Sequence, residues 1–235
     1  MTEKHLSTQF DAELSGISTR VLEMGGLAEA QVAQSLYALT NFSAETADQV
    51  LRQEERVNAM EVEIDRDLSS IIARRQPTAR DLRLLIAISK TIANLERVGD
   101  EAARIARTVQ RLINTGVSSR LRLPVNDLAY ESDLAIAQLR KALDAFARLD
   151  VAKAIEVLKQ DDQIDQEFEG LMRKLITYMM EDPRTISSSI DLIFVAKAIE
   201  RVGDHAKNLA EAIIYIVKGT DVRHNPVQTV ESMVQ

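Results

Sequence analysis

Apolar residues recur at alternating steps of three and four along most of the chain, the period of an α-helix packed on one face. The run from Leu85 to Ile113 shows this spacing, and the run from Leu192 to Val217 repeats it. Turn-forming residues are scarce, because the 235 residues include only 8 Gly and 4 Pro. The pattern therefore predicts an all-α protein made of long helices, whose coiled-coil-like seams pack neighbouring helices together.

Prolines and capping residues mark where these helices should begin and end. Ser43 and Asp150 have the position and chemistry of N-caps, whereas Gly116 and Gly219 have those of left-handed C-caps. The prolines fall where the period stops, at Pro77, Pro124, Pro183 and Pro226. The expected helices span 6–42, 44–75, 79–115, 124–149, 151–181 and 185–218.

The same landmarks occur twice at a nearly constant separation. Ser43 and Asp150 are 107 residues apart, and the string Glu-Arg-Val-Gly-Asp fills 96–100 and again 200–204, 104 residues later. An internal duplication explains this spacing. We therefore predict six long helices in two homologous three-helix bundles, one in residues 1–118 and the other in 119–235.

Each string places two carboxylates four residues apart, Glu96 with Asp100 and Glu200 with Asp204, so that each pair shares one helix face. One such pair is usually just a solvated helix edge. A solvated edge has no reason to repeat the whole string, including a glycine that weakens a helix at the same place. Carboxylates from facing bundle helices bind hard cations in di-iron and di-manganese proteins, so the strings are candidate metal sites.

The second helix of each bundle should supply further ligands, because an antiparallel hairpin brings its acidic stretch level with the string. Glu54 and Asp161 begin these two stretches. The predicted metal ligands are Glu96, Asp100, Glu55 and Asn58 in the first bundle, and Glu200, Asp204, Asp162 and Asp165 in the second.

The two sites should not be equal, and their metal is not specified by the sequence. Arg104 has Asn208 as its counterpart, so we expect more positive charge around the first string. Oxygen ligands do not distinguish magnesium, manganese, iron and calcium, and zinc is not excluded.

Composition and missing motifs narrow the function. The net charge of −7 opposes general nucleic-acid binding, and the absence of Cys excludes disulfides and thiol catalysis. There is no phosphate loop, nucleophile elbow or His-rich zinc pattern, so we expect no catalytic residue and no organic cofactor. The polar start, Met1 to His5, and the lack of a long uncharged apolar run predict a cytoplasmic protein.

Together these features predict a helical adaptor protein with structural or sensory metal sites, and two alternatives stay open. A metal-dependent enzyme on the helical-bundle carboxylates would need an open coordination position and a proton-transfer group. A structural oligomer that binds no metal would leave the acidic strings as ordinary surface.

Several stretches together resemble the PhoU family, which regulates bacterial phosphate-specific transport. The resemblance extends from about Phe10 to His224, and rests on 24–26, 75–83, 88–92, both Glu-Arg-Val-Gly-Asp strings, 177–182 and 217–219. It implies two three-helix bundles, commonly dimeric, with metal clusters at the strings. It also implies a non-enzymatic negative regulator of phosphate uptake and of the phosphate-starvation (Pho) regulon, linking the ATPase component of a phosphate ABC transporter to a sensor histidine kinase.

Overall fold

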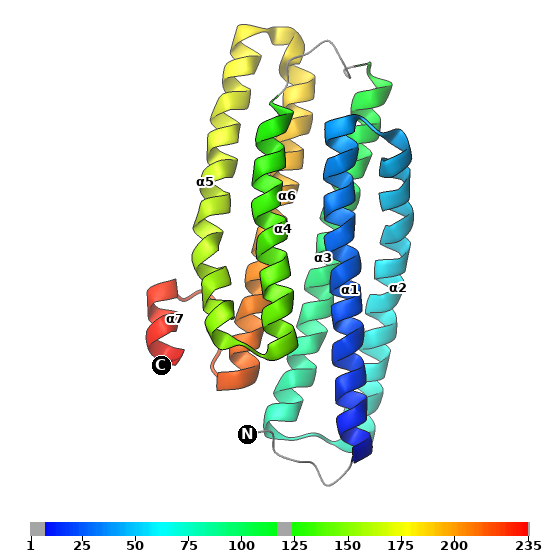
Figure 1. Cartoon of the computed structure of the whole chain (residues 1–235), viewed down its shortest axis with the longest axis vertical. Coiled ribbons are helices and arrows are strands. Elements are labelled where there is room, and N and C mark those ends of the chain that lie inside the picture. Colours follow the sequence, from blue (N-terminus) through cyan, green and yellow to red (C-terminus); the bar gives the residue numbers. More distant parts are fainter. Residues whose placement is uncertain (1–7, 117–123, 235) are drawn as a thin grey trace.

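The computed structural model describes residues 8–116 and 124–234, and these form helices joined by short turns (Figure 1). The expected boundary between the two bundles, at residues 118 and 119, lies outside the described residues. The helices are α1 (Thr8–Asn41), α2 (Ala44–Arg75), α3 (Ala79–Asn114), α4 (Val125–Arg148), α5 (Val151–Glu181), α6 (Ile186–Lys218) and α7 (Val227–Val234), with a 3₁₀ turn at Pro183–Thr185.

The capping residues act as the sequence predicts. The Ser43 hydroxyl accepts a hydrogen bond from the Thr46 backbone N–H at 3.2 Å. The Asp150 carboxylate accepts one from the Lys153 backbone N–H at 3.1 Å. Gly219 ends α6 with φ of +74°, a left-handed conformation in which a side chain would be strained. Local sequence chemistry therefore sets these helix ends.

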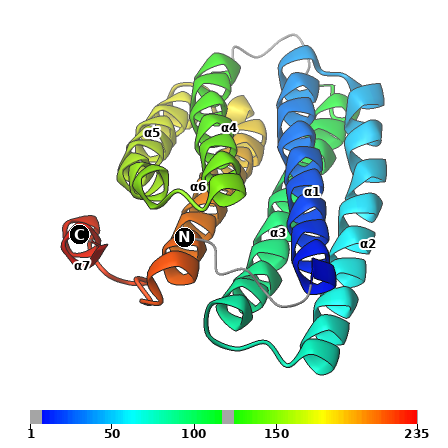
Figure 2. The same cartoon turned by 60° about the horizontal axis from the view of Figure 1, so that its bottom comes forward.

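The three helices of each repeat pack on one another, α1–α3 in the first and α4–α6 in the second. The repeats meet through two further pairs, α3 with α6 and α1 with α4 (Figures 1 and 2). Contacts between α3 and α6 join residues whose numbers sum to about 302, such as Arg111 with Asp191 and Glu101 with Arg201, so these two helices run antiparallel. The fold class and the duplication are confirmed.

The predicted seam is the core of both bundles. Leu85, Ile92 and Leu95 on α3 are buried, as are Leu192 and Ile199 on α6. Burial of such side chains stabilises the fold by about 1.5–3 kcal/mol each. The seam thereby fixes which face each third helix turns to solvent, and with it the position of the acidic strings.

One helix was not predicted. Pro226 is followed by α7, whose Val230 and Val234 are buried and whose Glu231 forms an ion pair with Lys159 of α5. Figure 2 shows α7 as a short helix standing beyond α6 at the C-terminal end. No helix among the described residues is long and apolar enough to cross a membrane.

Candidate functional site

The first string lies where α3 faces α2. Glu96 and Asp100 are partly buried, and burial, followed by the charges of Asp100 and Glu61, raises the pKa of Glu96. The pKa of Glu61 is also raised, mainly by burial and then by Asp65. Within residues 8–116 and 124–234, no cation forms an ion pair with Glu96 or Asp100. The two carboxylates of the first string therefore have no ion-pair partner in this part of the chain, although Arg97 acts on Glu96 and Arg107 pairs with the neighbouring Glu54.

The second string has the same five residues and a different environment. Lys197 donates a hydrogen bond to Glu200 at 2.6 Å, and Lys207 pairs with the buried carboxylate of Asp161. Burial, then Glu200 and Asp161, raises the pKa of Asp204, although both lysines oppose the shift. The second string thus has a lysine paired with one of its carboxylates, whereas the first string has none among the described residues.

This finding corrects the expectation that positive charge gathers around the first string. Arg104 donates to Glu101 at 2.9 Å, on the side that faces α6, and leaves the string itself unpaired. The second repeat instead has Lys197 paired with Glu200 and Lys207 paired with Asp161, where the first repeat has Ala93 and Ala103. Helix geometry explains the error, since residues eight apart on α3 are separated by about 80° around the axis.

The second helices bring some of the predicted ligands to the strings. Glu54 and Glu61 of α2 act on Glu96, whereas Glu55 is exposed. Asn58 is partly buried, with its Oδ1 unpartnered.

In the second repeat, Asp165 is exposed yet close enough to Asp161 and Asp204 that burial and these two charges raise its pKa. Asp162 is exposed and acts only on Asp165 among these groups. Among the residues that the structure describes, no three His, Cys, Asp or Glu side chains are arranged as ligands of one ion. The donor chemistry of the first face suits a hard cation, but binding would require the side chains to rearrange.

The glycine of each string has a structural reason. A Cβ atom built on Gly99 would lie 3.1 Å from Oε1 of Gln31, and one on Gly203 would lie 3.0 Å from Oε1 of Gln138. Both glutamines are fully buried, and each donates to a backbone carbonyl of the second helix, Gln31 to Val50 and Gln138 to Val157. The glycines therefore make room for a buried glutamine in each bundle.

Known proteins share this duplicated arrangement. A family model described as "PhoU domain" matches residues 21–109 and again 130–213, one match in each repeat. The chain belongs to the PhoU family.

The chain is 50% identical over 224 residues to a Burkholderia sp protein named phosphate-specific transport system accessory protein PhoU homolog, covering 95% of each chain. It is 46% identical to the Escherichia coli K12 protein named phosphate-specific transport system accessory protein PhoU, over 94% of this chain and 90% of that one.

Solved PhoU structures have the same architecture. The crystal structure of PhoU from Pseudomonas aeruginosa matches with a TM-score of 0.83 and 43% identity, over 90% of this chain and 100% of that chain. The PhoU structure from Streptococcus pneumoniae, described as a phosphate transport system regulatory protein, matches with a TM-score of 0.83 and 28% identity, over 91% and 99% of the chains. The PhoU fold therefore accounts for both repeats together.

Sequence reasoning missed one buried acid of this PhoU-family chain. Glu131 of α4 is 1% exposed, and neither of its carboxyl oxygens has a hydrogen-bond partner. Burial, then the charges of Glu200 and Glu167, raises the pKa of Glu131 to about 8. A signal was available, because Glu131 lies on the apolar face of its helix between Leu128 and Ala135. Its counterpart in the first repeat, 107 residues earlier, is the buried Met24.

Proposed function

We propose that this protein is a non-enzymatic accessory and regulatory protein of phosphate-specific transport. The observation that carries the proposal is the double PhoU-domain match, one in each repeat. Whole-chain similarity supports it, because the Burkholderia and Escherichia coli relatives are named as accessory proteins of that transport system. A chain that keeps both repeats keeps the scaffold on which those relatives are built.

In this proposal the protein acts in the cytoplasm when phosphate is plentiful. It contacts the ATPase component of the phosphate ABC transporter and a phosphate sensor histidine kinase, represses the Pho regulon and restrains phosphate uptake. The duplicated scaffold supports such a role, because it presents two related faces that differ in charge, as the strings at Glu96 and Glu200 do. Two unequal faces suit one protein that binds two partners.

The apolar surface at one end of the second repeat supports association with other polypeptides. Met180 is 80% exposed and Phe194 is 55% exposed, and Ile186 and Ile190 on the same hairpin are also exposed. Exposed apolar patches of this kind commonly mark protein–protein contacts. We propose that association includes a homodimer, which sedimentation at several protein concentrations would detect.

A bound metal ion is the second part of the proposal. Glu96 and Asp100, with Glu54 and Glu61 of α2, would hold a hard cation, which would neutralise their mutual repulsion. The all-carboxylate set supports magnesium, manganese, calcium or iron in preference to metals bound by thiolates. Glu200 and Asp204 would bind more weakly, because Lys197 and Lys207 already lie beside them.

A metal-dependent enzyme is the alternative with less support, since the relatives are named as accessory proteins. Such an enzyme needs a proton-transfer group that reaches the substrate. Glu131, with its pKa raised to about 8, is fully enclosed by the bundle and cannot reach one without opening it.

The test is a deletion strain that carries a reporter of a phosphate-starvation promoter. We expect the reporter to be active in high phosphate without the protein, and silent again when the wild-type gene is supplied on a plasmid. A second plasmid carries Arg56→Gln as the matched control for expression, since Arg56 is an exposed side chain on α2. Normal repression in the deletion strain would contradict the proposal.

A further inference from the structure

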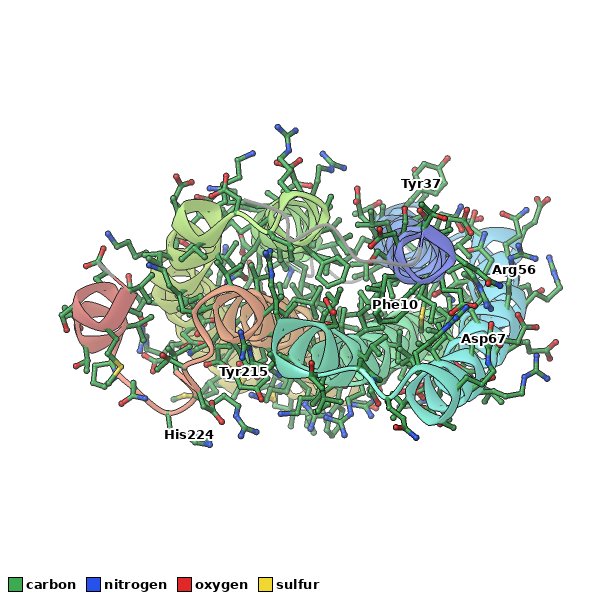
Figure 3. All side chains as sticks on the ribbon, turned by 90° about the horizontal axis from the view of Figure 1, so that it is seen from below. Phe10, Tyr37, Arg56, Asp67, Tyr215 and His224 are labelled. Carbon is green, nitrogen blue, oxygen red and sulfur yellow. The ribbon has the colours of Figure 1, made fainter. Side chains whose placement is uncertain are left out.

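A groove lies between α3 and α6 and is closed at one end by the segment after α6. It has a volume of about 320 Å³ and is lined by Lys90, Arg97, Asn208, Tyr215 and Arg223, among others. A second hollow of about 600 Å³ adjoins it and shares Asn208 and Arg223. Figure 3 shows Tyr215 and His224 on the side of the molecule opposite Tyr37, so the groove opens on that side.

The internal duplication predicts an ion pair at this groove that the second copy of the contact lacks. Where α3 crosses α6, Arg201 donates to Glu101 at 3.0 Å. Residues 104 positions apart are counterparts, so the matching contact would join Arg97 to residue 205. Residue 205 is His205, which carries no negative charge. In the described part of the chain Arg97 forms no ion pair, so one of the two symmetric crossing contacts lacks its anion.

The local charges agree with that reading. The one carboxylate of Glu101 already serves two guanidinium groups, those of Arg104 and Arg201. The counterpart position offers Arg97 no carboxylate, because His205 occupies it and its Nδ1 lies 3.0 Å from Asn94 Oδ1. Arg97 also acts on Glu96 and Glu61 at the string, but among the described residues no carboxylate forms an ion pair with it.

Neighbouring groups are held in place for binding. Asn94 Oδ1 accepts hydrogen bonds from His205 Nδ1 and from Asn208 Nδ2, each at 3.0 Å. One N–H of the exposed Asn208 amide is thus engaged, and the other remains for a ligand. Lys90 lies over the ring of Tyr215, with its Nζ 5.7 Å from the ring centre.

Two acidic residues also line the groove, and their negative charge would oppose the binding of an anion. Asp221 is already engaged by Arg223, which donates to it through Nε at 2.9 Å. Burial raises the pKa of Glu211, which favours its uncharged form relative to an exposed glutamate. In the described part of the chain neither Arg97 nor Lys90 forms an ion pair, so both charges remain available in the half of the groove next to α3.

We infer that this groove binds a tetrahedral oxyanion of the phosphate class, with Arg97, Lys90 and Asn208 as donors, so that the anion supplies Arg97 with the negative charge that residue 205 does not. The planar guanidinium of Arg97 suits two oxygens of such a group, and the ammonium of Lys90 supplies a point charge. The source is either inorganic phosphate or the terminal group of a small phosphate ester. This site goes beyond the proposed regulatory role, which does not depend on it.

The experiment is isothermal titration calorimetry at constant ionic strength with inorganic phosphate, and separately with glycerol phosphate. At the other crossing contact the carboxylate of Glu101 pairs with Arg201. His205→Glu introduces the counterpart of that carboxylate, so it should neutralise Arg97 and weaken binding at least about tenfold. Arg97→Gln should weaken binding to a similar extent. Arg56→Gln is the matched control, because Figure 3 places Arg56 on the outer side of α2, and it should bind like the wild type.

The outcomes separate the sources and can overturn the inference. Heat with inorganic phosphate alone identifies the free anion, and heat with glycerol phosphate alone identifies an ester. Absence of binding with both ligands would overturn the site, as would equal affinity in the wild type and His205→Glu. If Arg97→Gln fails to fold by circular dichroism, His205→Glu still decides, because it adds an ion pair and leaves Arg97 in place. Failure here would leave the reporter test of the regulatory role unaffected.

Discussion

In the first repeat, Glu96 and Asp100 lie beside Ala93 and face the carboxylates of α2, with no cation paired to them among the described residues. In the second repeat the same five-residue string has Lys197 bound to Glu200. Two copies of one motif on one scaffold therefore have different electrostatics. The backbone and seam determine where a string lies, and the residues one turn away determine what it can bind.

The cores of the repeats differ in a related way. Met24 fills a buried position in the first repeat with an apolar side chain, and Glu131 fills the matching position in the second with an unpartnered carboxyl group. The acid lies next to Glu200, so the second string has a carboxyl group on its buried side as well. Exchanging residues between the repeats tests whether these neighbouring side chains cause the difference.

The largest effect should come from Glu131. Its pKa is raised to about 8 in the folded protein, above the ordinary value of 4.5, so the folded state holds a proton that the unfolded state releases. The contribution of Glu131 to the free energy of unfolding is therefore fully present below pH 4.5 and is lost as the pH rises to about 8. The free energy of unfolding falls by about 1.4 kcal/mol per pH unit in this range, roughly 3–5 kcal/mol in all. Glu131→Met should remove this loss, measured by urea unfolding at pH 5, 7 and 9.

Met24→Glu is the reciprocal change and should have the opposite sign. It buries a carboxyl group where the first repeat has an apolar side chain, so it should create a loss of stability with rising pH. If both substitutions leave the pH dependence of unfolding unchanged, the assignment of a buried, proton-holding Glu131 is wrong.

The next effect concerns the ion pairs at the edge of each face. Lys207→Ala leaves the buried carboxylate of Asp161 without its partner and should cost about 1–3 kcal/mol. Arg107 pairs with Glu54 at 2.7 Å in a more exposed setting, so Arg107→Ala should cost less than about 1 kcal/mol. Denaturant midpoints of the two variants at pH 7 test the difference, and equal losses would contradict it.

A smaller effect should separate the two glycines. A Cβ on Gly203 would lie 2.9 Å from Cδ1 of Ile164, whereas the apolar atom nearest to a Cβ on Gly99 is Cγ1 of Val57 at 3.4 Å. Alanine gains about 1 kcal/mol of helix propensity at both sites, but overpacking at Gly203 costs about 1–3 kcal/mol. Gly203→Ala should therefore destabilise the protein by about 1 kcal/mol more than Gly99→Ala. Thermal unfolding of both variants decides the order.

The smallest effect should come from exchanging the lysine next to the string. Lys197→Ala removes the partner of Glu200, and Ala93→Lys supplies the matching partner to Glu96. One such pair contributes about 0.2–0.5 kcal/mol, so the affinity for Mn²⁺ should rise about twofold in the first variant and fall about twofold in the second. Titration followed by the paramagnetic relaxation of water protons measures both, and changes of the same sign would contradict the account.

The features that could be predicted from the sequence are those that each helix determines by itself. The caps at Ser43 and Asp150, the seam through Leu95 and Ile199, and the duplication are all encoded in local chemistry and spacing. The helix after Pro226 was missed because it is short, and its two buried valines cover only one turn.

What could not be predicted depends on how separate helices face one another. The sequence could not show that Glu61 joins Glu54 beside Glu96, or that Phe168 replaces Glu61 in the second repeat. Nor could it show that Arg104 turns away to Glu101. Extending the 107-residue offset to every position would have revealed Gln31 and Gln138 as a duplicated pair.

The most direct test of the two unequal faces is the metal content, by inductively coupled plasma mass spectrometry, of protein purified without an affinity tag or chelator. The comparison is between the wild type, Glu96→Gln with Asp100→Asn, and Glu200→Gln with Asp204→Asn. We expect stoichiometric metal in the wild type, its loss in the first double variant and its retention in the second. Metal-free wild-type protein, or metal lost only from the second double variant, would contradict the account.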